Sequence, residues 1–402
     1  ERRDWRGFLR RRPLPVGGGG RVIDVAKRSL ITLRLARAAK TGAIVASANT
    51  QGPYGEDWIR DGAFINWMLD RIGLTGWVTK HNRFYARVQA SPSNPSAVRP
   101  DGNWAMNSYS DGVDGAPIPW EIDETGLGAW TLWDHYGHLR GAAARRYLAA
   151  VYPAIGRAAD FLTTCEDPSN GLQCTANEDD NYTPSQSLHG AAPVELGLRS
   201  AIAAAKAIGD RSSRVGSWRA RLARLRAAIA ALYDPKTRSY KPGSQVGNSY
   251  NVDYGDGGWM LWPVRFKPYR NPTMRGEAHA VYRAMKKSLH ASRGQYEAKA
   301  LLGLAHAWRP YSPRHRRELR KTLRYMAGAL TTPTGLFGES WERYPSGRPF
   351  PVQDMPHVWE HTLFYLSALA IEGSARYRFA GRGYVARACA RPEAPPTASA
   401  PR

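Results

Sequence analysis

The sequence predicts an all-α fold in which helical hairpins form a ring and long loops gather at one end. Apolar residues recur at spacings of three and four through most of the chain, in segments rich in the helix formers Ala, Leu and Arg. Long loops rich in Gly, Pro, Asn, aromatic residues and carboxylates occupy every second connection. Because long loops in a compact domain are usually functional, this alternation predicts a toroid with a loop-lined pocket.

Eleven segments carry clear helical periodicity, and a twelfth helix, with weaker periodicity, is expected around 255–266 to complete an even dozen. Pro193 and Gly209 should bracket one helix, and Ser312 with Pro313 should open another. The eleven segments are 21–39, 61–72, 74–90, 124–139, 144–163, 193–208, 213–232, 274–289, 294–308, 313–330 and 358–374.

The helices group into one domain spanning 21–376, preceded by an N-terminal extension (1–20) and followed by a tail (377–402). The Pro, Ala and Arg content of the tail predicts disorder at its end. No apolar run approaches the roughly 18–20 residues that a membrane-spanning helix needs. The chain begins at Glu1, so an upstream segment, with a secretion signal as one candidate, is expected to have been removed.

Two of the three cysteines flank a turn-like stretch. Cys165 and Cys174 lie on either side of Glu-Asp-Pro-Ser-Asn-Gly, whereas Cys389 has no evident partner. The pair either closes a small disulfide loop, as in exported proteins, or consists of two unrelated buried thiols. The first alternative points to a secreted or cell-envelope-associated protein.

The charge distribution is uneven. The chain carries 57 Lys and Arg against 34 Asp and Glu, yet 100–139 and 158–198 each contain seven carboxylates and no Lys or Arg. Either these carboxylates are kept unpaired for a neutral ligand, or chance loop composition produces the pattern. The cations are scattered along helical faces without a nucleic-acid-binding motif. This predicts a solvated basic exterior and no nucleic-acid partner, and leaves loose association with an anionic cell envelope open.

The first long loop leads into a helix through Trp58, Arg60 and Asp61. Arg60 and Asp61 form either a charge pair at the helix end or a hydroxyl-binding clamp beside an aromatic ring, an arrangement that suits sugars. The sequence TGAIVAS, followed after the loop by WIRDGAF, resembles the entry motif of glycoside hydrolase family 15, the glucoamylase-like enzymes. The resemblance implies that Arg60 and Asp61 grip the terminal glucose.

The second long loop ends in PIPWEIDETG (117–126), which is similar to the motif that opens the family's next inner helix. The resemblance makes Trp120, Glu121 and Asp123 candidate substrate-binding residues. The structural alternative is that Asp123 caps the helix and Trp120 is a packing residue.

The third long loop carries the acidic triplet Glu178-Asp179-Asp180. In the family, the Glu of a Gly-Leu-Trp-Glu motif at this place is the general acid. The Trp is missing here and the triplet lies a few residues later, so the resemblance implies Glu178 as the acid and Asp179 as a contact to the neighbouring sugar. The alternative is a solvated turn or a cation site.

The fourth long loop (247–259) matches no family motif. Asp253 and Asp256 could coordinate calcium, but their spacing is not that of an EF-hand. We therefore expect residues that line the wall of the pocket, and no metal or organic cofactor.

The fifth long loop contains GLFGESWERY (335–344), similar to the family motif whose Glu is the general base, which implies that role for Glu339. Glu342 is a rival in the same stretch, and Trp341 is a further candidate contact to the substrate.

The segment PHVWEHTLFYL follows, and its Trp359 and His361 match the family's Trp and His. Glu360 replaces the usual Ser, which adds a second rival for the base and a further candidate substrate contact. Trp359 is the aromatic candidate in this segment.

Glycosidic cleavage requires two separated carboxyl groups, one protonated to support the leaving oxygen and one ionised to activate water. The acid needs a raised pKa, which we expect the neighbouring Asp179 and Asp180 to supply to Glu178. The resemblance implies an (α/α)6 barrel and an inverting, exo-acting hydrolase of α-glucosides whose partner is an oligo- or polysaccharide. The alternatives are a hydrolase of the same fold that acts on trehalose, dextran or an envelope glycan, and a non-catalytic carbohydrate-binding protein.

Overall fold

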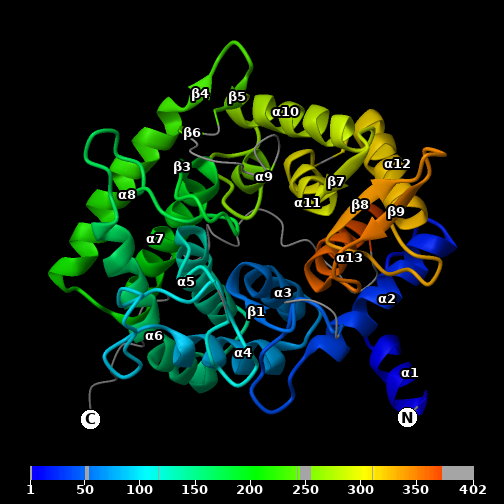
Figure 1. Ribbon diagram of the computed structural model, residues 1–402. Helices are drawn as coiled ribbons and strands as arrows, with labels where there is room; N and C mark the ends of the chain where they lie inside the picture. Colours follow the sequence, from blue (N-terminus) through cyan, green and yellow to red (C-terminus); the bar gives the residue numbers. More distant parts are fainter. Residues whose placement is uncertain are drawn as a thin grey trace, which may run out of the picture.

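The computed structural model describes residues 2–49, 54–115, 117–241, 243–244, 255–309 and 311–373. Within them, an inner ring of helices closes on itself, because each helix contacts the next and the last contacts the first (Figure 1). The inner helices are α3 (Ile59–Arg71), α5 (Ile122–Tyr136), α7 (Leu188–Ile208), α9 (Gly255–Leu261), α11 (Glu297–Ala307) and α13 (Val358–Glu372). The outer helices are α2 (Gly20–Ala36), α4 (Thr75–Val88), α6 (Gly141–Thr164), α8 (Ser213–Ala231), α10 (Pro272–Ser288) and α12 (Pro313–Ala329). The predicted (α/α)6 barrel is confirmed.

The two rings differ in how their residues are buried. Every residue of α13 is buried, as expected for a helix with neighbours on all sides. In contrast, α12 buries only one stripe at helical spacing and exposes a strongly basic face. The buried stripe of α12 consists of Leu319, Thr322, Leu323, Met326 and Ala327.

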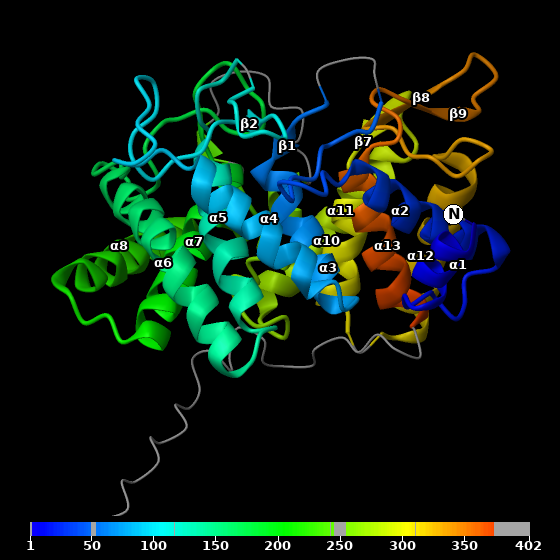
Figure 2. The same ribbon diagram turned by 90° about the horizontal axis from the view of Figure 1, so that it is seen from below.

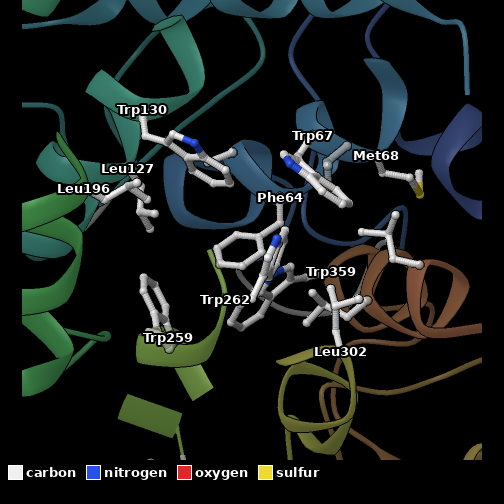
Figure 3. Packing of buried hydrophobic residues seen from close by; sticks show 14 of the residues in the cluster. Phe64, Trp67, Met68, Leu127, Trp130, Leu196, Trp259, Trp262, Leu302 and Trp359 are labelled. Carbon is white, nitrogen blue, oxygen red and sulfur yellow. The ribbon is translucent and has the colours of Figure 1, made fainter. Parts of the chain in front are cut away.

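Aromatic side chains fill the axis of the barrel (Figure 3). The ring of Phe64 lies 6.0 Å from Trp130, 5.5 Å from Trp259, 5.1 Å from Trp262 and 5.6 Å from Trp359, measured between centroids. Phe64, Trp130, Trp259 and Trp359 lie on α3, α5, α9 and α13, and Trp262 directly follows α9. One aromatic cluster therefore connects four helices of the inner ring. The packed axis places the candidate pocket above this cluster, among the loops.

The predicted helices are all present, but two boundaries are off by five residues. Helix α9 ends at Leu261 rather than near 266. Helix α7 begins at Leu188 rather than at Pro193, which lies inside the helix. Its N-terminus is capped by Ser187, whose hydroxyl accepts a hydrogen bond from the backbone N–H of His189. Gly209, with a φ of 84°, ends the helix as predicted, and Ser312 caps α12.

Short strands join the loops to one another at one end of the barrel (Figure 2). Antiparallel pairing connects β1 to β2, β3 to β6, and β8 to both β7 and β9. These strands are β1 (Asp57–Trp58), β2 (Asn107–Ser108), β3 (Gln186–Ser187), β6 (Gly243–Ser244), β7 (Arg293–Gln295), β8 (Ser340–Arg343) and β9 (Pro349–Val352). A separate hairpin, β4 (Tyr233–Asp234) with β5 (Ser239–Tyr240), follows α8. The β1–β2, β3–β6 and β7–β8 pairs each join two different loops and hold them in place, whereas β8 and β9 form a hairpin within one loop.

The N-terminal segment lies against the barrel. Helix α1 (Arg2–Arg10) buries Phe8, whose ring stacks on Trp77 of α4 at 5.9 Å. Further along, the carbonyl of Pro13 accepts a hydrogen bond from the hydroxyl of Tyr365 at 2.6 Å. Residues 374–402, which include the whole predicted tail, lie outside the described residues. Over the described residues, none of the helices combines the length and apolarity that crossing a bilayer requires.

Candidate active site

Buried carboxylates gather where the long loops meet the inner ring. They come from the first turns of α3, α5 and α13, from the residue before α5, from the loop before α7 and from the residue before β8. Each is at most 8 % exposed: Asp61, Glu121, Asp123, Glu124, Glu178, Asp179, Glu339 and Glu360. Burying so many ionisable groups is costly unless they are paired, so their concentration marks a candidate functional site.

Arg60, in the first turn of α3, is the centre of this cluster. Its guanidinium donates to Glu121 at 2.6 Å, to Asp123 at 2.9 Å and to Asp180 at 3.3 Å. Its backbone N–H donates to Glu124 at 3.3 Å. One buried arginine thus links the first three long loops, a larger role than the simple charge pair with its neighbour Asp61.

Asp123 and Trp120 have different surroundings. Burial opposes ionisation of Asp123, but Arg60 and His189 outweigh it, so the pKa of Asp123 lies below its usual range. No side chain caps α5, so the capping alternative for Asp123 is wrong. Trp120 is half-buried and packs edge-on against Phe161 of α6, as its packing alternative describes.

Glu178 lies in a polar niche formed by its own loop. Its carboxyl accepts hydrogen bonds from Gln173 at 2.9 Å, from the backbone N–H of Ser187 at 3.2 Å, and from the Ser187 hydroxyl. Burial raises the pKa of Glu178 to about 7, although Ser187, Gln173 and the nearby His189 all lower it. The expectation that Asp179 and Asp180 would raise this pKa is wrong, because their carboxylates are directed to Arg60 and burial is the cause.

The turn after Glu178 has an unusual backbone. Asp179 and Asp180 have φ values of 52° and 58°, in the left-handed region that Asp adopts more readily than most residues. The backbone N–H of Asp180 donates to Glu121 at 2.6 Å. The left-handed turn therefore directs the carboxylates of both Asp179 and Asp180 towards Arg60. Because Glu178 and Asp179 are buried, the alternative of a solvated turn is wrong for these two residues.

Glu339, the residue before β8, receives three hydrogen bonds from two other segments. Tyr54 donates to Oε2 at 2.8 Å, while Gln295 and Tyr296 donate to Oε1 at 3.1 and 2.5 Å. Burial and the carboxylate of Glu339 raise the pKa of Tyr296 and Tyr54 well above the usual range, so both phenols stay protonated donors. The three donors therefore fix the position of the Glu339 carboxyl.

The two rivals for the base role differ from Glu339 and from each other. Glu342 is exposed, because β8 alternates and buries Trp341 on its other face. Glu360 is 4 % exposed and lines a small cavity together with Glu339. Only Glu339 and Glu360 therefore lie inside the cluster.

The aromatic candidates form the wall and floor of the site. Trp58 stacks on Tyr54 at 5.2 Å and donates from Nε1 to Asp180 at 3.2 Å. Trp341 is buried over Gly294, where an added Cβ would lie 2.7 Å from the indole. Trp359 is buried against Phe64 and belongs to the aromatic floor.

Two further polar residues complete the cluster. Burial raises the pKa of Asp61 well above its usual range, although Arg60 opposes this. His189 Nε2 lies 3.4 Å from Asp123 and 3.6 Å from Asp179. His361, in contrast, has a structural role: it contacts the hydroxyl of Ser29 at 3.0 Å and accepts from the N–H of Phe337 at 3.1 Å.

The calcium alternative for the fourth loop lies outside the described residues, since neither Asp253 nor the side chain of Asp256 is among them. The prediction that this loop lines the wall of the pocket also concerns residues that are mostly outside the described ones.

The two segments without cations along the chain do pair with cations in space. Arg60 donates hydrogen bonds to Glu121 of the first segment and to Asp180 of the second. Arginines outside the two segments pair with other carboxylates; for example, Arg224 donates to Glu166 at 2.7 Å. Further pairs are Asp114 with Arg99, Asp134 with Arg71, Asp160 with Arg214, and Glu195 with Arg226. The interpretation that both segments keep their carboxylates unpaired is therefore wrong in general. Among the described residues, Glu178 and Glu339 form no ion pair with Lys or Arg.

Sequence reasoning missed the neutral donors that surround the two candidate catalytic glutamates. These are Tyr54, Gln173, Ser187, Gln295 and Tyr296. A signal existed for Tyr54, which lies in the long loop before Trp58, and for Ser187, which opens a helix. Gln295 and Tyr296 precede α11 without any distinctive pattern.

Comparison with known proteins places the chain among glycosidase folds, although no family model matches it. It is 28 % identical over 142 residues to an uncharacterized glycosyl hydrolase of Methanocaldococcus jannaschii; the match covers 35 % of this chain and 21 % of that protein.

Among solved structures, a glycosidase variant in complex with glucose superposes with a TM-score of 0.63 at 17 % identity, over 87 % of this chain and 97 % of that one. A glucoamylase from Saccharomycopsis fibuligera superposes with a TM-score of 0.65 at 11 % identity, over 89 % and 96 %. The chain thus shares the barrel fold of a glucoamylase and of a second glycosidase.

Proposed function

We propose that this protein is an inverting, exo-acting glycoside hydrolase that releases glucose from α-glucosides, with Glu178 as general acid and Glu339 as general base. The observation that carries the proposal is the contrast between two buried carboxyls. Burial raises the pKa of Glu178 to about 7, which keeps a proton available at neutral pH. Three hydrogen bonds from Tyr54, Gln295 and Tyr296 hold the Glu339 carboxyl in place. Titratable groups with environments this different suit separate acid and base roles.

In the proposed reaction, the carboxyl of Glu178 gives its proton to the glycosidic oxygen as the bond to the anomeric carbon breaks. A water molecule attacks that carbon from the opposite face, and Glu339 takes the proton from the water. The sugar is released with inverted configuration, and the aglycone leaves with the proton of Glu178. The surrounding carboxylates favour the positive charge that develops on the sugar ring.

The remaining candidates would bind the sugar. Arg60 and Asp61 would hold hydroxyls of the terminal glucose, as the resemblance to glycoside hydrolase family 15 implies. Asp179, Trp58 and Glu360 border the same cluster, and Glu121 and Asp123 contribute by fixing Arg60. The likeness in fold to the glycosidase with bound glucose and to the glucoamylase supports glucose as the released sugar.

The test is a panel of α- and β-linked disaccharides and oligosaccharides, with trehalose and dextran included, in which proton NMR follows the anomer of the product as it forms. We expect β-glucose from α-linked substrates. Release of the α-anomer would contradict the inverting mechanism. Binding without hydrolysis of any member of the panel would make the protein a carbohydrate-binding protein.

Three variants assign the roles. Glu178→Gln and Glu339→Gln should each lower kcat by at least about a hundredfold, the range expected when general acid or base catalysis is lost. Glu342→Gln is the matched control, because it makes the same change at an exposed site in the same motif, and it should keep wild-type activity. Full activity in Glu339→Gln would overturn the base assignment.

We also propose that the protein functions outside the cytoplasm. Cys165 and Cys174 form the disulfide that their flanking positions suggested, and such bonds persist in oxidising compartments. Mass spectrometry of alkylated protein isolated from its natural host should find both cysteines unmodified before reduction. Two alkylated cysteines would contradict the proposal.

A further inference from the structure

A cavity of about 10 Å³ lies behind Glu339, between α11, α12, α13 and β8. Its polar lining comes from Tyr296, Glu297, Glu339, Ser340 and Glu360. This is about the space of one water molecule, and a buried water needs two to four polar partners. The size and the lining of the cavity both suit a single water.

Glu360 is the ionisable residue of this lining that has an oxygen without a hydrogen-bond partner among the described residues. It is 4 % exposed, and among the described residues its Oε1 has no hydrogen-bond partner. A buried polar atom without a partner is costly, and a buried charge more so. A hydrogen-bond partner for Glu360 in the cavity would remove this cost.

Charged groups face Glu360 from three sides. Glu297 and Lys299 lie on α11, Asp61 on α3, and Glu339 beside β8, whereas α12 contributes only apolar side chains to the cavity. Burial raises the pKa of Glu360 well above its usual range; Glu297 and Glu339 add to this, and Lys299 opposes it. A glutamic acid side chain that carries its proton can donate a hydrogen bond as well as accept one.

Glu339 retains capacity to accept a further hydrogen bond. A carboxylate offers about four acceptor sites. Gln295 and Tyr296 bond to Oε1, and Tyr54 bonds to Oε2. A water in the cavity can therefore donate to Glu339 without displacing the donors already present.

We propose that Glu360 is a positioning residue for Glu339, and that its protonated carboxyl holds a water in the cavity which in turn donates to Glu339. This rests on the proposed function, in which Glu339 is the base. No proton is transferred along this chain; the Glu360 O–H donates to the water and the water O–H donates to Glu339. Because a hydrogen bond to the ionised form lowers a carboxyl pKa, removing this chain should shift the acidic limb of activity to higher pH.

The first test is the pH profile of kcat/KM, whose acidic limb reports the free base. Glu360→Met removes the donor while leaving a side chain of similar size, and should move the acidic limb upward by about one pH unit. Glu360→Gln keeps a neutral donor, and its limb should stay at the wild-type position. Glu342→Met, the exposed control in β8, should also leave the limb unchanged.

Two results would overturn the proposal. The first is an unchanged limb in Glu360→Met. The second is a limb that moves to lower pH in Glu360→Gln, since this would mean that Glu360 is ionised and repels Glu339.

The second test does not depend on activity. A high-resolution crystal structure at neutral pH should show one water within about 3.2 Å of carboxyl oxygens of both Glu360 and Glu339. An empty cavity, or a water that bonds only one of the two, would refute the proposal even if the protein hydrolysed no glycan. Failure of the proposed function would instead appear as an inactive wild type with this water in place.

Discussion

Arg60 donates from Nη2 to Glu121 Oε2 at 2.6 Å, joining the first turn of α3 to the residue that precedes α5. Both side chains are almost fully buried, at 3 % and 0 % exposure. Asp123 and Asp180 bind the same guanidinium, so Arg60 neutralises charge that three loops bring together. The fork of the guanidinium can serve several carboxylates at once, which an ammonium group cannot do in the same way.

Replacing Arg60 should destabilise the protein strongly. Arg60→Met leaves buried carboxylates without their cation, and breaking a buried ion pair typically costs about 3–5 kcal/mol of unfolding free energy. Urea denaturation at pH 7 measures this loss, which should shrink near pH 4 because the carboxylates then take up protons. Arg219→Met, at an exposed site on α8, should stay within about 0.5 kcal/mol of wild type. A loss that does not depend on pH would argue against unpaired carboxylates as its cause.

Glu178→Gln should change the pH dependence of stability as well as activity. The pKa of Glu178 is raised from its usual value of 4.5 to about 7, so the folded state binds more protons than the unfolded state between these values. The contribution of the residue to stability is therefore fully present below pH 4.5, is lost as the pH rises, and is gone above about pH 7. Gln cannot ionise, so the Glu178→Gln variant should not lose this stability as the pH rises.

Relative to wild type, Glu178→Gln should therefore gain about 3 kcal/mol of unfolding free energy between pH 4.5 and pH 8. Parallel urea titrations of the two proteins at these pH values measure the difference, with Glu342→Gln as the exposed control. A constant difference across the range would show that Glu178 is not a buried acid with a raised pKa.

The helices could be predicted from sequence because their signal is local. Periodic burial follows from neighbouring positions, so even the boundaries of α12 and the end of α7 were predicted. The start of α7 was missed because a proline is tolerated inside the helix, where the cap at Ser187 sets the true beginning. The ring closure followed from the alternation of short and long connections.

The site could be predicted only in part, because its decisive contacts join distant residues. Tyr54 and Glu339 are separated by 285 positions, and no local pattern links them. The prediction of unpaired carboxylates in the two cation-free segments was wrong for the same reason, since Arg60 and Arg224 bind those carboxylates from helices outside the segments. The raised pKa of Glu178 was predicted, but burial, which causes it, depends on the whole fold.

The disulfide should stabilise the loop that carries Glu178. Cys165 and Cys174 close a loop of ten residues, which corresponds to about 2–3 kcal/mol of unfolding free energy from loop-closure entropy. The double variant Cys165→Ser/Cys174→Ser should lose about that amount in urea denaturation under non-reducing conditions. Adding a reductant should destabilise wild type to the same level and leave the double variant unchanged; a reductant effect on the double variant would place the sensitivity elsewhere.

Two glycines in helices should respond in opposite directions to substitution by alanine. Gly126 of α5 meets α7 so closely that an added Cβ would lie 2.3 Å from the carbonyl oxygen of Pro193. That atom belongs to the backbone and cannot rotate away, so Gly126→Ala must push two inner helices apart, at a cost of about 1–3 kcal/mol or more. Gly216 of α8 has open space around its Cβ position, and Gly216→Ala should stabilise the protein by about 0.5–1 kcal/mol because alanine is the better helix former. Urea denaturation of both variants checks the pair, and a loss in Gly216→Ala equal to that in Gly126→Ala would mean that close packing of α5 against α7 is not what requires Gly126.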